Sequence, residues 1–198
     1  MSDDTSPRIE PVVPPYAPEV GAELARWMPP GSALEPLALF RTLTRHVPLA
    51  RAMLPLGRHF LGRGQNLGLR AREIVIDRVC ARCGCEYEWG VHVAAFGAAA
   101  GLDAAQARAT IAGEGDGRVW EDGDRLLVAL VDELHDSGRV SRPLWQALAG
   151  RWSVPQLLEL LVLAGWYHVI SYVANGAQVE LETWAERFPT PARPEGDR

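Results

Sequence analysis

The chain has 198 residues, a formal net charge of −5 at pH 7 and 47% hydrophobic residues. This length allows one substantial core or at most two small ones. The acidic balance, without any basic stripe, argues against a nucleic-acid-binding protein. The chain does not open with a secretory signal, and its three cysteines do not make a disulfide framework. We therefore expect a cytoplasmic protein with no membrane partner.

The first 31 residues are predicted to form a proline-rich arm. Proline fixes φ and removes backbone donors, so we expect an extended segment lying over the core or over a partner subunit. A short helix from Val20 to Met28 interrupts this arm. Ser32, with Glu35 three residues on, predicts a capping box and a helix start. The helical pattern breaks at His46-Val47-Pro48 and resumes over residues 49–61.

Further segments are predicted as helices from their apolar spacing. They cover residues 69–82, 85–100, 103–113, 121–137, 141–148 and 154–176. Asp103 with Gln106, and Ser153 with Gln156, supply N-terminal caps for two of them.

The last of these helices is the most apolar, but Glu159 and His168 interrupt it. A membrane-spanning helix tolerates such residues poorly, so we expect a buried core helix. No segment alternates long enough for a confident strand. The sequence therefore predicts an all-α multi-helix bundle over residues 32–188, followed by a loose tail over 189–198.

Residues 72–92 concentrate the reactive side chains and hold all three cysteines. With Cys85 at the start of its helix, Glu88 and His92 follow at i+3 and i+7 and Trp89 at i+4, all on one face. The positive end of the helix dipole favours a thiolate at Cys85. Glu88 and His92 can hydrogen-bond and exchange a proton. Glu73, on the preceding helix, can fold back alongside if the chain reverses at Gly84.

Plainer interpretations stay open for each of these residues. Cys80 lies on an apolar face and is predicted to pack in the core. Glu88 and His92 can also form an ordinary surface pair, and Trp89 can be a core residue. A zinc site built from Cys80, Cys83, Cys85 and His92 is disfavoured, because zinc usually takes two separated ligand pairs. We expect no metal and no cofactor.

The segment resembles the carboxymuconolactone decarboxylase family, in the superfamily that includes alkyl hydroperoxidase D-type proteins. Arg72-Glu73, Cys85 and the run from Glu86 to His92 carry the resemblance, which extends from about residue 35 to 184. It implies an all-α fold that usually oligomerises. In the hydroperoxidase branch, residues matching Glu73 and His92 relay a proton to a Cys-x-x-Cys pair. The first cysteine of that pair matches Cys85, and the second falls on Glu88.

The leading hypothesis is a thiol-dependent peroxidase-like oxidoreductase acting on a small molecule. Cys85 attacks a hydroperoxide, and His92, Glu88 and Glu73 relay the proton. Cys83 is the candidate resolving thiol, and a thiol reductant protein is a possible partner. A homo-oligomer is expected.

Two other functions stay open. The first is a cofactor-free decarboxylase or lyase on a small carboxylated lactone, with His92 and Glu88 as acid and base and Arg72 or Arg82 holding the carboxylate. The second is a non-enzymatic oligomer that binds a small molecule in an aromatic pocket. That pocket is predicted from Trp89, Trp166, Tyr167 and His168.

Overall fold

The computed structural model describes residues 6–29, 31–32, 34–62, 64–112 and 119–189, which contain helices and no strand. The elements are α1 (Pro18–Trp27), α2 (Ala38–Leu43), a 3₁₀ turn (Thr44–His46), α3 (Val47–Leu61), α4 (Leu69–Arg82), α5 (Glu86–His92), a π-helical turn (Val93–Gly97), α6 (Ala104–Ala112), α7 (Asp122–Ser137), α8 (Arg142–Ala149) and α9 (Val154–Ala177). The predicted all-α class is confirmed.

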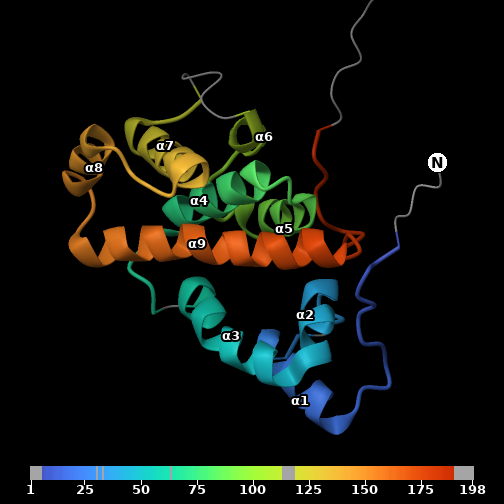
Figure 1. The fold of residues 1–198 in the computed structure, drawn as a ribbon. Coiled ribbons are helices and arrows are strands. Elements are labelled where there is room, and N and C mark those ends of the chain that lie inside the picture. The colour runs from blue at the N-terminus through green and yellow to red at the C-terminus, as the bar shows by residue number, and fades with distance from the viewer. Residues whose placement is uncertain (1–5, 30, 33, 63, 113–118, 190–198) are drawn as a thin grey trace, which may run out of the picture.

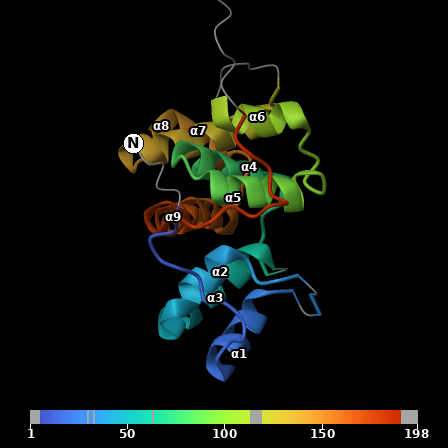
Figure 2. The ribbon, with the colours of Figure 1, turned by 90° about the vertical axis from the view of Figure 1, so that its right-hand side faces the viewer.

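The long helix α9 divides the molecule into two groups of helices (Figures 1 and 2). The helices α4 to α8 lie on one side of α9, and α1 to α3 lie on the other. Leu160, Leu163 and Ala164 of α9 are fully buried. By length and composition α9 could cross a membrane, but half of its most apolar window is buried inside the protein. It is packed as the central helix of the bundle (Figures 1 and 2).

The N-terminal segment lies over the core, as the proline pattern predicts. The backbone N–H of Arg8 donates to the carbonyl of Ala177 at the end of α9 (2.8 Å). The N–H of Val12 donates to the carbonyl of Arg41 in α2 (3.2 Å). The segment thus connects the two helix groups at one end of the molecule (Figure 1).

The caps are predicted correctly at two helices and wrongly at a third. Asp103 and Gln106 exchange hydrogen bonds at the start of α6, and Ser153 with Gln156 forms the capping box of α9. Ser32, however, caps no helix, because α2 begins only at Ala38. A residue before proline is disfavoured in the α region, and Pro36 therefore delays the helix. Residues 113–118, and residues 190–198 of the predicted tail, lie outside the described residues.

Gly90 allows the C-terminal segment to pass directly over α5. A Cβ at this position would lie 2.1 Å from the carbonyl oxygen of Glu186, and the N–H of Glu186 donates to the carbonyl of Gly90 (3.2 Å). Gly90→Ala should therefore lower the free energy of unfolding by about 1–3 kcal/mol, the usual cost of overpacking.

Urea denaturation monitored by circular dichroism measures this change. The matched control is Gly21→Ala in α1, where the new Cβ would meet only Tyr16 Cβ at an ordinary 3.7 Å. That variant should be neutral, or more stable by up to about 1 kcal/mol. Equal stability of the two variants would contradict the close approach at Gly90.

Candidate functional site

A buried chain of charged side chains connects α4 to α5. Arg72 Nε donates to Glu73 Oε1 (2.6 Å), and the other oxygen of Glu73 lies 2.7 Å from His92 Nδ1. Arg72 also donates to the carbonyl of Phe60 (3.2 Å). The chain reverses between the two helices at Gly84, which has a φ of +60°. The predicted approach of Glu73 to His92 is confirmed.

The second ring nitrogen of His92 faces two more polar groups. Nε2 lies 3.1 Å from the Tyr167 hydroxyl of α9 and 3.4 Å from Glu88 Oε1. Burial lowers the pKa of His92, but the charge and hydrogen bond of Glu73, together with Glu88, outweigh burial and raise this pKa to about 10. At neutral pH His92 is therefore an imidazolium with both N–H groups engaged.

Asp77 lies one turn after Glu73 in α4 and is fully buried. Neither of its carboxyl oxygens has a hydrogen-bond partner among the described residues. Burial raises its pKa well above the usual range, although the charge of His92 opposes this and that of Glu73 adds to it. Burial thus favours the protonated form of Asp77, next to the ionic chain. The sequence signal for it is a lone carboxylate within the apolar run Ile74–Val79.

A cavity of about 700 Å³ opens where Glu88, His92 and Tyr167 face the α1–α3 group. These three side chains form one polar patch of a mainly apolar wall, to which Arg26 and Arg58 also contribute. Glu88 Oε2 has no hydrogen-bond partner among the described residues. The aromatic residues that line the cavity are Trp27, Phe40, Phe96, Trp166, Tyr167 and Trp184.

The cysteines do not line this cavity. Cys85 is 0% exposed, and burial raises the pKa of its thiol to about 12, although the backbone amide of Glu88 opposes the rise. The expected thiolate at Cys85 is therefore wrong, because complete burial outweighs the dipole of a short helix. Cys80 packs in the core, as predicted. Cys83 is partly buried, and burial raises its pKa as well.

The residues predicted to bind a substrate do not all lie at the cavity. Tyr167 and Trp166 line the cavity, whereas Trp89 lies in the core and its Nε1 donates to Thr110 Oγ1 (2.9 Å). Glu88 and His92 form a buried pair and not a surface pair. Cys85, Glu88, Trp89 and His92 therefore do not share one functional face.

Neither arginine predicted to hold a substrate carboxylate lines the cavity. Arg72 is bound to Glu73, and Arg82 pairs with Asp136 and Asp132 on α7. His168, also predicted as a binding residue, contacts His135 of α7. Four of the aromatic lining residues, Trp27, Phe40, Phe96 and Trp184, were not predicted, because they come from α1, α2, the π-helical turn and the C-terminal segment, which lie far apart in the sequence. A tryptophan at the end of α1, Trp27, was the available signal.

Comparison with known proteins shows a similarity of fold. No protein-family model matches the chain, and no curated protein sequence matches it. A crystal structure of an uncharacterized peroxidase-related protein from Silicibacter sp. TM1040 has a similar fold, with a TM-score of 0.63. The match covers 72% of this chain and 75% of that chain at 14% sequence identity. The chain thus shares the all-α fold of that protein.

Proposed function

We propose that the protein performs cofactor-free acid–base chemistry on a small, largely apolar molecule bound in the cavity. The observation that carries this proposal is the polar patch formed by Glu88, His92 and Tyr167 in a mainly apolar cavity. Two neighbouring groups with opposite proton-transfer roles are the usual arrangement for such chemistry.

Glu88 is the proton acceptor, because one of its oxygens has no partner among the described residues while the other lies near His92. His92 is the proton donor, since its raised pKa keeps it protonated at neutral pH. Glu73 and Arg72 hold the imidazolium in place and do not line the cavity. The substrate class is a small lactone or related carbonyl compound with an acidic C–H group.

A carboxylated substrate would place its charge at the edge of the cavity, near Arg58. This side chain lines the cavity and donates to the carbonyl of Arg26 (2.7 Å), and no described carboxylate pairs with it. Arg58 therefore takes the role that Arg72 and Arg82 were expected to play.

The test is proton exchange or CO₂ release from small carboxylated lactones, followed by NMR in deuterated buffer. Glu88→Gln should lower turnover by about 10²- to 10⁴-fold, the usual contribution of a general base. Cys85→Ser should keep wild-type turnover. Full activity of Glu88→Gln would overturn the proposal.

A second candidate is thiol-dependent hydroperoxide reduction at Cys85. The similar fold of a peroxidase-related protein and the position of Cys85 immediately before α5 favour it. Its burial means that the thiol must first become exposed and lose its proton. The test is peroxide consumption with dithiothreitol as reductant. This candidate is the better one if wild-type protein consumes peroxide, Cys85→Ser does not, and the lactones show no turnover. Cys83 would then be tested as the resolving thiol, and a cytoplasmic thiol protein as the reductant.

We also propose that a second copy of the chain packs on α9. One stripe of this helix is apolar and exposed, with Leu158 at 59%, Val162 at 47%, Val169 at 44% and Tyr172 at 66%. The spacing of these residues, with exposed Gly165 between Val162 and Val169, alternates between three and four, the pattern of a helix–helix seam. Nothing lies within 4 Å of a Cβ built at Gly165, so another helix could approach closely there.

The double variant Val162→Glu/Val169→Glu should therefore reduce the mass measured by light scattering to that of a monomer, because it places charges in the apolar seam. Leu49→Glu is the matched control, since Leu49 is 48% exposed but lies on α3 outside the stripe. A monomeric wild-type protein, or an unchanged mass of the double variant, would contradict this assembly.

A further inference from the structure

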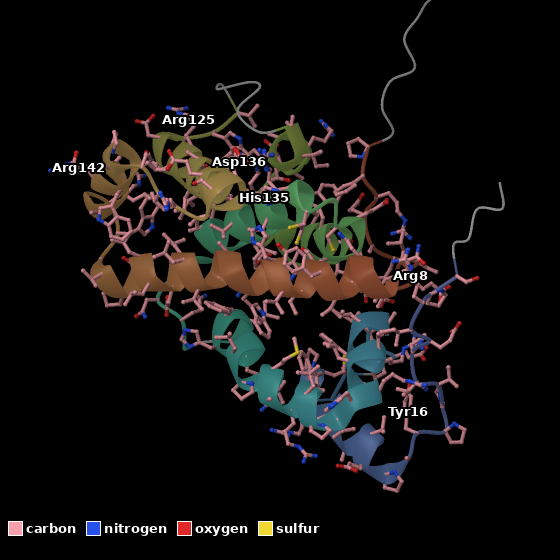
Figure 3. The ribbon with its side chains drawn as sticks, in the orientation of Figure 1. Arg8, Tyr16, Arg125, His135, Asp136 and Arg142 are labelled. Atoms are coloured by element: carbon pink, nitrogen blue, oxygen red, sulfur yellow. The ribbon has the colours of Figure 1, made fainter. Side chains whose placement is uncertain are left out.

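A second group of reactive side chains lies across α9 from the cavity. Cys83 directly follows α4, His135 lies in the last turn of α7, and His168 lies within α9. The Cys83 sulfur and one ring nitrogen from each histidine all lie within 4.8 Å of one another. Figure 3 labels His135 on the side of α9 away from α1–α3. We propose that these three side chains form a binding site for a thiophilic divalent metal ion, with Zn²⁺ the best match.

The distance between the two histidines suits such an ion. His135 Nδ1 and His168 Nε2 are 3.0 Å apart. Two nitrogen ligands of a tetrahedral zinc ion, each about 2.0–2.1 Å from the metal, lie about 3.3 Å apart. The histidine pair therefore needs only a small adjustment, and the Cys83 sulfur needs a shift of about 1 Å to complete three ligands.

The hydrogen bonding of His168 also prepares it as a ligand. Its Nδ1 lies 2.8 Å from the carbonyl oxygen of Ala164. A carbonyl can only accept, so Nδ1 carries the proton and the lone pair of Nε2 points toward His135. Metal-binding histidines typically donate their other ring N–H to a backbone carbonyl or a carboxylate in this way.

Metal binding at this site releases a proton. The Cys83 thiol loses its proton to solvent as the sulfur binds the metal. Asn175 of α9 donates to the carbonyl of Cys83 (2.8 Å) and holds the end of α4 in place. Three protein ligands leave one coordination position for water.

Calorimetric titration of the chelator-treated full chain with Zn²⁺ tests the proposal. We expect one ion per chain. Cys83→Ser and His168→Gln should each weaken binding by more than the roughly 10- to 100-fold that loss of an outer-shell partner costs. His59→Gln is the matched control, because His59 is a partly exposed histidine outside the cluster, paired with Glu159. This variant should bind Zn²⁺ as wild type does.

A second measurement needs no variant. Addition of Co²⁺ to wild-type protein should produce a thiolate-to-cobalt charge-transfer band, and Zn²⁺ should protect Cys83 from alkylation as read by peptide mass spectrometry. Absence of the band, or equal Zn²⁺ affinity in wild type and Cys83→Ser, would overturn the proposal. His135 and His168 would then be only a hydrogen-bonded pair.

Discussion

Glu73→Gln should lower the free energy of unfolding near neutral pH by about 3–5 kcal/mol, the usual cost of removing one partner from a buried ion pair. Glu73 contacts the Arg72 guanidinium and the His92 ring, and all three side chains are buried. Without the carboxylate, Arg72 keeps its charge in the interior, and His92 loses the partner that keeps it protonated.

The same variant should change how stability depends on pH. In the folded protein the pKa of His92 is about 10, above its ordinary 6.5, so the folded state holds a proton that the unfolded chain releases between these values. The stabilisation is complete below pH 6.5 and is lost as pH rises through 10. The slope from this group is at most about 1.4 kcal/mol per pH unit. It should become smaller in Glu73→Gln, where Glu88 alone remains to raise the pKa of His92.

Urea denaturation at several pH values measures both effects. Asp124→Asn is the matched control, because it removes an ion pair with Arg70, whose side chain is 30% exposed. This variant should lose less free energy of unfolding than Glu73→Gln. The dependence of its stability on pH between 6.5 and 10 should stay as in wild type. Identical pH profiles of wild type and Glu73→Gln would show that His92 is not held as an imidazolium.

Cys85 should react with iodoacetamide at pH 8 roughly 1,000-fold more slowly than an ordinary cysteine, because the thiolate fraction falls tenfold for each unit of pKa. Burial raises the pKa of the Cys85 thiol from 9.0 to about 12. Cys83, which is only partly buried, should be modified first.

Peptide mass spectrometry over a time course reads the modification of each cysteine. In denaturant, where burial is lost, all three cysteines should react at similar rates, which provides the internal control. Fast alkylation of Cys85 in the folded protein would show that the thiol is reached through motion of α5 or α9. That result would favour the peroxidase candidate over acid–base chemistry.

Much of the bundle could be predicted from local sequence signals. The helices α4, α7 and α9 follow their apolar spacing, and Ser153 with Gln156 marks the start of α9. These signals depend only on residues within a few positions of one another. The start of α2 was predicted too early. Ser32 and Glu35 match a capping box, but Pro36 disfavours the α conformation at the residue before it.

The candidate site was predicted in part. Helical spacing predicted the contact between Glu88 and His92, and the break at Gly84 predicted the approach of Glu73 to His92. The partnership with Tyr167 joins residues 75 positions apart, so local spacing could not specify that contact. The raised pKa of Asp77 depends on burial, which periodicity indicates only coarsely. A cytoplasmic location stays a prediction.

The sequence by itself determined the all-α class and the buried position of the last helix, and it indicated residues 72–92 as the candidate site. Only the tertiary structure decided which of those residues face a ligand. Burial removed Cys85 from the cavity and made its thiol hard to ionise, whereas the packing of α5 against α9 brought Glu88, His92 and Tyr167 to the cavity wall. Charge and reactivity depend on the dielectric and on partners from distant helices, which residue spacing does not encode.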